Sequence, residues 1–378
     1  MEILCRLPVK SLLQFKSVCK NWYALIQNPD FIYLHHDRAT SIAAARNTDC
    51  LLVKRFLNGG EGAAALSFVP NQTPVEDIDI SSTGLDIEHV KILGHCNGVV
   101  CLSGLLNSTI VLCNPSMKEF RILPQPSYKN DHMSNLGFGY DPSTDDYKVV
   151  RFAMMSTDAR IGGIDKKVQM YDLSTDSWRD VDAESPSESG FHCSYYCYTS
   201  WNGDCFWYAH RWDGGDPVIM AFSMSDEVFE EIPVPEVCLL EFSEKKLFVL
   251  NDSLAMVMYS KWWSNPSWFS PEEYLLNTVD IWVLNEEDIE VSWAKKFSIE
   301  PFQGLDWALG FRQNGEFLLQ SSCGQMMSYN LYSQERKEYE VHDQVRGRPR
   351  PPHIQVLLYT ESLVSVKRRN EVDGYVEL

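Results

Sequence analysis

Positive charge is scarce in this 378-residue sequence. It has 33 Lys and Arg against 52 Asp and Glu, which gives a formal net charge of −19. Because nucleic acids and acidic membranes bind basic surfaces, this balance argues against both and favours basic partners. No apolar run approaches the length of a membrane span, and Met1-Glu2 opens no signal peptide. We therefore expect neither a membrane segment nor secretion.

Zinc-type cysteine spacing is also missing. None of the eleven cysteines forms a Cys-x-x-Cys pair, and the closest two are Cys193 and Cys197. The cysteines are most simply reduced thiols, which favours the cytoplasm. The short basic run Lys367-Arg368-Arg369 is compatible with a nuclear location as well.

The sequence lacks the common catalytic motifs, namely the Gly-x-Ser-x-Gly elbow, His-Glu-x-x-His and a phosphate-binding loop. Asp141, Asp145 and Asp146 are more typical of an Asx turn than of a calcium site. We expect His95 to bond the backbone of the adjacent Asn97-Gly98 turn, not to act with Cys96. The sequence thus predicts no catalytic residue, no metal and no cofactor.

The N-terminal residues have a helical pattern. Apolar residues recur from Leu12 to Ile26 at steps of three and four, the period of an amphipathic helix. Ser11 is the predicted N-cap, Asn28-Pro29 ends the run, and Asp30 could cap a further turn. A module this small needs the rest of the chain or a partner to be stable.

Part of this region resembles an F-box, the module that binds the Skp adaptor of a cullin-RING ubiquitin ligase. The resemblance rests on Leu7-Pro8-Val9-Lys10-Ser11-Leu12, Phe15-Lys16, Val18-Cys19-Lys20, Trp22 and Leu25-Ile26. It implies an adaptor surface made of Leu4, Leu7, Pro8, Val9, Leu12, Leu13, Val18, Cys19 and Trp22. F-boxes of this kind begin further upstream, so the first helix is shortened here, and either the start site is misplaced or the adaptor grip is weakened. The alternative is a helical hairpin that serves only the core of this chain.

From residue 50 onward the sequence indicates β-strands. Turns with Gly, Asn or Asp separate short apolar runs, and large aromatic residues recur at Phe120, Trp178, Phe229 and Trp293. Their spacings of 58, 51 and 64 residues suit blades of a kelch-like β-propeller, which repeat at about 50 residues. The predicted fold is therefore mainly β, with a small α-helical module and a propeller of roughly six divergent four-stranded blades. A β-sandwich is the alternative fold.

The same region resembles the plant F-box-associated domain. The resemblance rests on the segments Gly94-His95-Cys96-Asn97-Gly98-Val99-Val100-Cys101, Leu112-Cys113-Asn114-Pro115, Leu136-Gly137-Phe138-Gly139-Tyr140-Asp141, Asp146-Tyr147-Lys148-Val149-Val150, Tyr171-Asp172-Leu173 with Trp178, and Tyr359-Thr360-Glu361-Ser362-Leu363-Val364. We divide the chain into an F-box at 1–38, a connector at 39–49, the propeller at 50–370 and a tail at 371–378. Within this family the sequence is most similar to S-locus F-box and S-locus-F-box-like proteins. Those proteins recognise basic style ribonucleases in self-incompatibility.

The resemblance implies a non-catalytic receptor subunit that binds the Skp adaptor and, through it, cullin and a RING protein. Loops at 156–166, 182–189, 211–216 and 261–267 are polar insertions between strands, where binding function is often found. The candidate target-binding residues are Asp158, Arg160, Asp165, Glu184, Arg211, Trp212, Asp213, Trp262 and Trp263. Two alternatives remain: a propeller interaction protein without a ligase link, and a propeller enzyme or sugar binder. A central pocket lined by convergent titratable side chains would favour the last.

Overall fold

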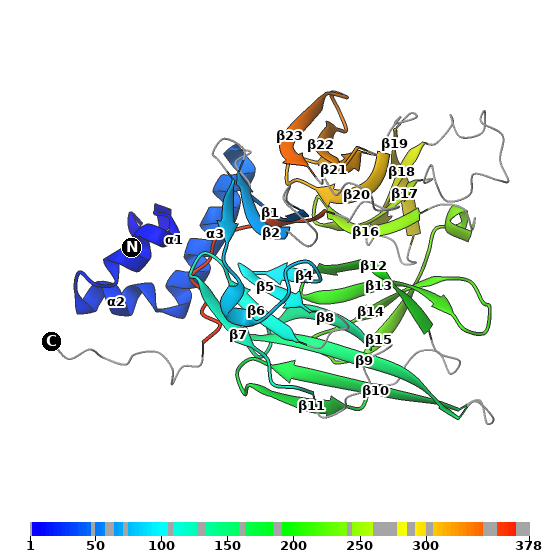
Figure 1. The fold of residues 1–378 in the computed structure, drawn as a ribbon, viewed down its shortest axis with the longest axis horizontal. Helices are drawn as coiled ribbons and strands as arrows, with labels where there is room; N and C mark the ends of the chain where they lie inside the picture. The colour runs from blue at the N-terminus through cyan, green and yellow to red at the C-terminus, as the bar shows by residue number, and fades with distance from the viewer. Residues whose placement is uncertain are drawn as a thin grey trace.

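A module of short helices adjoins a ring of β-sheets (Figure 1). The computed structural model describes residues 2–46, 50–56, 64–70, 75–104, 109–126, 134–158, 163–183, 191–239, 244–259, 278–285, 292–299, 305–321, 323–342 and 354–367. The helices are the 3₁₀ turn η1 (Leu4–Arg6), α1 (Val9–Phe15), α2 (Lys20–Ile26) and α3 (Pro29–Arg46), followed by the 3₁₀ turns η2 (Ser81–Thr83) and η4 (Glu236–Leu239).

The helix predicted from Ser11 to Gln27 is in fact two helices. α1 begins directly after Pro8, whose fixed φ suits a helix start, so Ser11 lies inside the helix and is not its cap. The chain then breaks at Cys19, which is extended with φ −162° and ψ 160°. The apolar period continues across this break, which is why the sequence alone did not reveal it.

The third helix also differs from the prediction. The side chain of Asn28 accepts a hydrogen bond from the backbone N–H of Asp30 at 2.8 Å, so Asn28 caps α3 and Asp30 does not. α3 then runs on to Arg46, through the segment predicted as a connector. It has almost no amphipathic pattern, so periodicity gave no signal for its length.

The strands of the described residues form six four-stranded antiparallel sheets. From the innermost to the outermost strand, the first sheet is β24 (Gln355–Tyr359), β1 (Cys50–Phe56), β2 (Ala64–Pro70) and β3 (Glu76–Ile78). The second is β4 (Lys91–Cys96), β5 (Val99–Ser103), β6 (Ile110–Asn114) and β7 (Glu119–Ile122), and the third is β8 (Ser134–Asp141), β9 (Asp146–Asp158), β10 (Gly163–Asp172) and β11 (Ser177–Val181). The fourth is β12 (Phe191–Trp201), β13 (Asp204–Arg211), β14 (Val218–Phe222) and β15 (Phe229–Pro233). The fifth is β16 (Glu244–Leu250), β17 (Ser253–Tyr259), β18 (Val279–Asn285) and β19 (Ser292–Ile299), and the sixth is β20 (Leu305–Phe311), β21 (Glu316–Ser321), β22 (Gln325–Asn330) and β23 (Arg336–His342).

These sheets are the blades of a closed propeller. The innermost strands contact one another in the cyclic order β4, β8, β12, β16, β20, β24 and back to β4. The ring closes because β24, from the C-terminal end, pairs with β1, with Cys50 opposite Tyr359 and Lys54 opposite Gln355. The predicted six-bladed propeller is confirmed, and the β-sandwich alternative is wrong.

The aromatic anchors used to count the blades all lie on outermost strands. Phe120, Trp178, Phe229 and Trp293 belong to β7, β11, β15 and β19. The indole N–H of Trp178 donates to the carbonyl of Pro124 at 2.7 Å, and that of Trp293 donates to Pro233 at 2.8 Å. Each bond reaches back to the end of the preceding blade, so the repeated tryptophan ties neighbouring blades together.

The propeller has two unlike faces. At one face, turns connect the innermost strand of a blade to the second strand and the third to the fourth, as at 97–98 and 115–118. The helices contact this side, so we call it the helix face; Met117, in one of these turns, packs against them. The other connections, including those that lead into each innermost strand, leave the sheets at the opposite side, which we call the far face.

Two glycines mark a close approach between the third and fourth blades. A Cβ atom on Gly139 of β8 would lie 1.9 Å from the carbonyl oxygen of Gly203 and 2.8 Å from Cγ of Met224. We predict that Gly139→Ala lowers the free energy of unfolding by about 1–3 kcal/mol, because the backbones must separate. Gly94→Ala is the matched control on an innermost strand, since its nearest atom is 3.6 Å away. Urea unfolding checks both; equal midpoints for the two variants would contradict the prediction.

Candidate functional site

The helical module has a small hydrophobic core of its own. Leu4, Val9, Leu12, Ile26 and Phe31 are buried in it, each 8% exposed or less. Leu363, from the segment after β24, completes this core. Leu4, Val9 and Leu12 were predicted to contact an adaptor, but they are used inside the chain and do not belong to the accessible surface.

Other members of the predicted adaptor surface remain accessible. Val18 is 60% exposed, and Pro8 and Cys19 are also exposed. Leu7, Leu13 and Trp22 are half-buried, and the Trp22 ring packs on Phe15 with centroids 5.2 Å apart. The break between α1 and α2 therefore places Val18 and Cys19 on an apolar surface that is not buried in the core of the helical module.

The module is held in a fixed position on the helix face. The Tyr33 hydroxyl of α3 bonds both the Tyr140 hydroxyl and the Asp145 carboxylate, in the β8–β9 region. The backbone N–H of Val9 donates to the Glu361 carboxylate at 3.2 Å. These contacts, together with Leu363, join the helices to two parts of the propeller that are distant in sequence.

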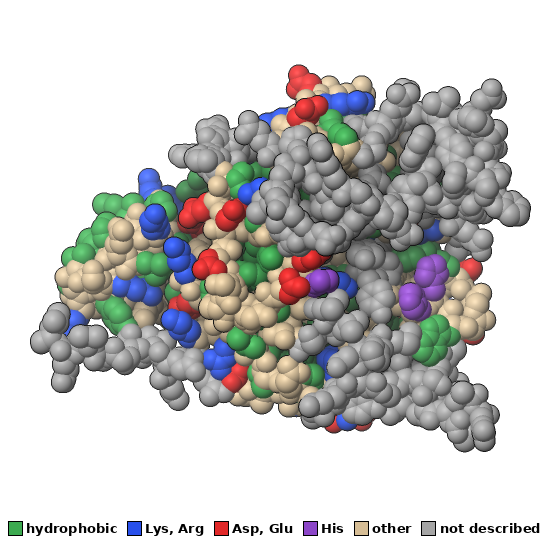
Figure 2. Space-filling model, viewed as in Figure 1, with side chains coloured by type: hydrophobic (Ala, Val, Ile, Leu, Met, Phe, Trp, Pro, Cys, Tyr) green, Lys and Arg blue, Asp and Glu red, His purple; other side chains and the backbone are tan. Residues whose placement is uncertain are grey.

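The two parts of the molecule differ in charge. Residues 1–38 contain five Lys or Arg and three Asp or Glu, so they carry +2 and the rest of the chain carries −21. Figure 2 shows Lys and Arg side chains gathered over the helices and Asp and Glu side chains over the adjoining sheets. The acidity inferred from the sequence is therefore a property of the propeller.

Three of the predicted target-binding residues lie together where β13 ends at the far face. Trp212 is 39% exposed. The Arg211 guanidinium pairs with the Glu231 carboxylate and lies 5.5 Å from the Phe191 ring centroid. The Asp213 carboxylate accepts a hydrogen bond from the Gly215 N–H at 2.9 Å. The result is a rigid turn with an exposed tryptophan, a residue type common at binding hot spots.

The other predicted target-binding residues are not tested by this geometry. Asp158 and Asp165 lie at the β9–β10 connection, where only their backbone is described. Arg160, Glu184, Trp262 and Trp263 lie outside the described residues. The described strands that flank these segments all end or begin at the far face, on the same side as Trp212.

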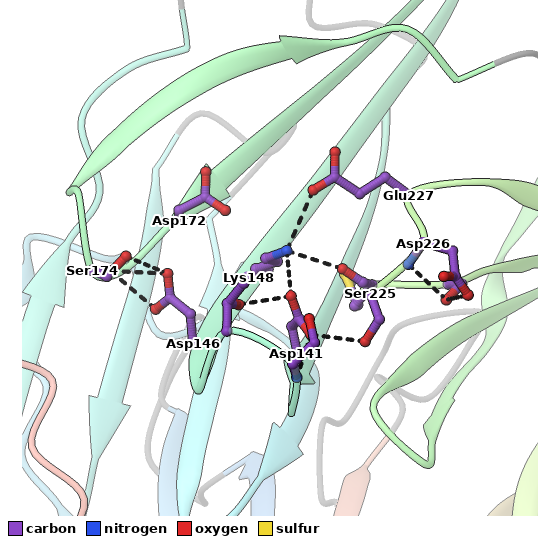
Figure 3. Close-up of polar contacts among 12 residues, drawn as sticks. Asp141, Asp146, Lys148, Asp172, Ser174, Ser225, Asp226 and Glu227 are labelled. Atoms are coloured by element: carbon purple, nitrogen blue, oxygen red, sulfur yellow. Dashed lines mark hydrogen bonds and ion pairs between the residues drawn. The ribbon is translucent and has the colours of Figure 1, made fainter.

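A buried ion-pair network, which the sequence analysis did not single out, connects the third and fourth blades (Figure 3). Lys148 of β9 lies at its centre, with Nζ 2.7 Å from Asp141 Oδ2, 3.1 Å from the Met224 carbonyl and 3.3 Å from Glu227 Oε1. The side chains of Lys148 and Asp141 are only 5% and 1% exposed. Arg179 of β11 also pairs with Glu227, so two cations from the third blade hold one carboxylate of the fourth.

The network fixes the charge of Asp141. Burial by itself would raise the pKa of this carboxyl group, but hydrogen bonds from Lys148 and from the hydroxyls of Ser143, Thr144 and Ser225 outweigh it. The pKa of Asp141 therefore lies well below its usual range. Its role is to join blades and to shape the 141–145 turn.

The aspartates of this turn do not converge on a cation. Asp141 accepts the Ser143 N–H at 2.8 Å, which is the predicted Asx turn. Asp145 accepts a hydrogen bond from the Tyr140 hydroxyl at 2.8 Å, and Asp146 accepts the Ser174 hydroxyl at 2.6 Å. Within the described residues, no group of three His, Cys, Asp or Glu side chains could hold a metal.

A central cavity of about 1090 Å³ runs through the ring of innermost strands. All six of these strands contribute to its lining, and Thr40 and Ser41 of α3 border it as well. Burial, with a smaller effect from His36, lowers the pKa of His95 in this lining to about 4, so the imidazole is neutral at pH 7. Its Nε2 is buried without a hydrogen-bond partner.

This cavity does not form a catalytic constellation among the described residues. The two carboxylates in the described lining are Glu88, next to β4 where it begins, and Asp252, in the β16–β17 turn. They lie at opposite ends of the channel, so they cannot share acid–base work on one substrate. The pocket that was expected for a propeller enzyme or sugar binder is therefore present, but its described lining brings no pair of carboxylates together.

Comparison with known proteins identifies both parts of the chain. Residues 66–366 match the F-box associated beta propeller domain, and residues 1–34 match the F-box domain. The chain belongs to the F-box proteins that carry this propeller.

The relatives of this F-box protein include several from Arabidopsis thaliana. The F-box protein At3g16210 is 30% identical over 245 residues, which cover 62% of this chain and 59% of the relative. The F-box/kelch-repeat protein At3g23880 is 26% identical over 361 residues, covering 92% and 90%. The chain thus spans less than two thirds of At3g16210 but most of At3g23880. A chain from a nidogen/laminin complex aligns with a TM-score of 0.43 and 12% identity, over 81% of this chain and 97% of that one.

No helix among the described residues is both long and apolar enough to cross a bilayer.

Proposed function

We propose that this F-box protein is the substrate-recognition subunit of a Skp-cullin-F-box ubiquitin ligase. Its helical module binds the Skp adaptor, which links it to cullin and a RING protein, and its propeller binds a target for ubiquitination. The observation that carries the proposal is the accessible apolar surface around Val18, presented by helices that are fixed to one face of the propeller. A rigid connection lets the receptor raise the local concentration of target lysines near the ubiquitin-carrying enzyme.

The adaptor surface in this proposal consists of Leu7, Pro8, Leu13, Val18, Cys19 and Trp22. Burying an apolar side chain such as Val18 at an interface contributes about 1.5–3 kcal/mol. Val18→Glu would instead bury a charge. We predict that this variant loses adaptor capture by at least about tenfold, which corresponds to 1.4 kcal/mol.

Co-purification with the Skp adaptor tests this prediction. Tyr332→Glu is the matched control, because Tyr332 is a 70% exposed apolar side chain on the propeller. Equal adaptor capture by both variants would exclude the Val18 surface. If the folded parent protein captured no adaptor, the alternative of an interaction protein without a ligase link would replace the receptor proposal.

For the target, we propose that it binds the far face and that it is a basic protein. The far face is turned away from the helices, carries Trp212 and bears the longer connections between strands. The charge of −21 on the residues after 38 attracts basic proteins. The finer proposal, based on the S-locus resemblance, is that the target is a style ribonuclease. Affinity capture from native tissue with the proteasome inhibited tests it: adaptor and cullin without a ribonuclease would contradict the finer proposal and keep the receptor function.

A further inference from the structure

Three sulfur atoms converge in the core between the fourth and fifth blades. Cys238 Sγ lies 3.1 Å from Met256 Sδ and 3.2 Å from Met258 Sδ. Cys238 belongs to η4, which joins β15 to β16, and both methionines belong to β17. Met256 and Met258 are two residues apart on a strand, so their side chains point to the same face of the fifth blade. We call these three side chains the sulfur cluster.

The sulfur cluster is buried among apolar side chains. Cys238, Met256 and Met258 are 1%, 0% and 5% exposed, and they share a hydrophobic core with residues of β14 and β16. The Cys238 N–H donates to the Pro235 carbonyl at 2.8 Å, which fixes the backbone that carries the thiol. Burial raises the pKa of this thiol to about 12, so it is protonated at pH 7.

Hydrogen bonding does not account for both sulfur–sulfur contacts at once. A thiol carries one proton and is a weak donor, so Cys238 can donate to Met256 or to Met258 but not to both. In either case one thioether faces the Cys238 sulfur with no proton between the two atoms. A cation among the three sulfur atoms would interact favourably with the lone pairs of all of them.

We propose that the sulfur cluster binds a soft monovalent metal ion, Cu(I), through Cys238 Sγ, Met256 Sδ and Met258 Sδ. Thiolate and thioether ligands select Cu(I), whereas carboxylate, carbonyl and water ligands suit Mg²⁺ and Ca²⁺. Charge favours the same ion, because one Cu(I) and one thiolate form a neutral centre, which can be buried without the cost of an unpaired charge. A divalent ion on these ligands would leave one positive charge uncompensated in an apolar core.

The cluster needs little adjustment to hold the ion. With metal–sulfur bonds of about 2.3 Å, as in zinc thiolates, the ligands of a three-coordinate ion lie about 4 Å apart, so each contact of Cys238 lengthens by less than about 1 Å. Methionine side chains have three rotatable bonds and can supply this movement. On binding, the Cys238 S–H bond breaks, the thiolate bonds to Cu(I) and the proton passes to the solvent. This site goes beyond the receptor function proposed above and does not depend on the adaptor.

Anaerobic titration of the full-length protein with Cu(I), in competition with the chelator bicinchoninate, tests the site. We expect the parent to retain one Cu(I) per chain, and Met256→Leu/Met258→Leu to bind it at least tenfold more weakly. This variant leaves all eleven cysteines in place, and leucine is close enough to methionine in volume for the fold to persist. Met326→Leu, at a fully buried methionine of β22, should bind like the parent. Loss of all Cu(I) from the parent to the chelator, or equal affinity in the double-leucine variant, would overturn the proposal and leave the cluster as core packing.

X-ray absorption at the copper edge of the loaded parent gives a second readout that does not depend on any variant. We expect one shell of three sulfur neighbours at about 2.3 Å. Nitrogen ligands, or two sulfur neighbours only, would place the ion elsewhere in the chain and overturn the proposal. Adaptor capture should be unchanged in the double-leucine variant, so a failed metal site and a failed receptor function give different results.

Discussion

Replacing Lys148 with methionine is expected to lower the free energy of unfolding by about 3–5 kcal/mol, because it removes one partner of a buried ion pair. Asp141 is 1% exposed and its Oδ2 lies 2.7 Å from Lys148 Nζ. In the variant this carboxylate would stay buried, with only hydroxyl and backbone donors to oppose its charge. Glu227 would keep Arg179 as a partner, so the lost free energy of unfolding comes mainly from the unpaired carboxylate of Asp141. Urea unfolding at pH 7 measures the effect.

The Asp141→Asn/Lys148→Met variant provides the control for this prediction. Removing both charges should cost less than removing Lys148 alone, since no buried charge is left unpaired. A double variant that is as unstable as the single one would show that packing, and not charge, sets the cost.

The pH dependence of the Lys148→Met effect has a definite sign. In the parent, the depressed pKa of Asp141 contributes stability that is complete above its unfolded value near 3.8 and is lost as the pH falls below it. Without Lys148 the hydroxyl donors remain but the cation is gone, so the pKa of Asp141 rises above its value in the parent and protonation relieves the penalty at a higher pH than in the parent. The difference between variant and parent should therefore shrink as the pH is lowered from 7 toward the usual aspartate value of 3.8. A constant difference over this range would contradict the ionic origin.

The middle strands of the blades could be predicted from the sequence because their residues are buried on both sides: β5, β6 and β14 are apolar and fully buried. The outermost strands β7, β11, β15 and β19 are mostly half-buried or exposed, and they were recognised by the aromatic anchors that gave the blade spacing. The short strand β3 was missed, since its three residues lie in a polar segment without alternation. A strand that is buried on both faces consists of a nearly continuous apolar run, and such a run can be recognised in the hydropathy of the sequence.

The innermost strands were harder to recognise for the opposite reason. Every residue of β4 is partly exposed, and it was interpreted as the approach to the Asn97-Gly98 turn. β12 and most of β20 were missed as well. A strand that borders a channel carries polar and small residues among its apolar ones, so neither alternation nor a continuous apolar run marks it. Because these strands form most of the lining, the central cavity could not be built residue by residue from the sequence.

Part of the predicted adaptor surface is buried in the chain's own core, for a related reason. Helical periodicity identifies apolar residues but does not say whether they face the chain's own core or a partner. Val9 and Leu12 are fully buried, whereas Val18 is 60% exposed, although all three fit the same motif. The missing information was the position of Leu363, which comes from the other end of the chain and fills the module's core.

The segment 362–367, which follows β24, has no strand partner and joins the helices to the second blade. The Asn114 side-chain amide donates to the carbonyls of Ser362 at 2.9 Å and Val364 at 2.8 Å. The carboxylate of Glu119 accepts the Val366 N–H at 3.2 Å. Between these anchors, Leu363 enters the core of the helical module. The same short segment is therefore anchored on the second blade and holds the helical module in place.

A chain that ends at Tyr359 should consequently be far less stable than one that ends at Lys367. The shorter chain loses Leu363 and Val366, which are 2% and 0% exposed, and each contributes about 1.5–3 kcal/mol through burial. It also removes the hydrogen-bond partners of the Asn114 amide and the Glu119 carboxylate. Leaving these polar groups unpaired inside the protein lowers the free energy of unfolding by more than the lost hydrogen bonds alone. We expect a lower urea midpoint and faster proteolysis within α1–α3, because the helices lose both Leu363 and the Glu361 carboxylate. If the two chains unfolded at the same urea concentration, the helices would not be held by this segment, and their orientation on the helix face would have to depend on contacts such as those of Tyr33 and Met117.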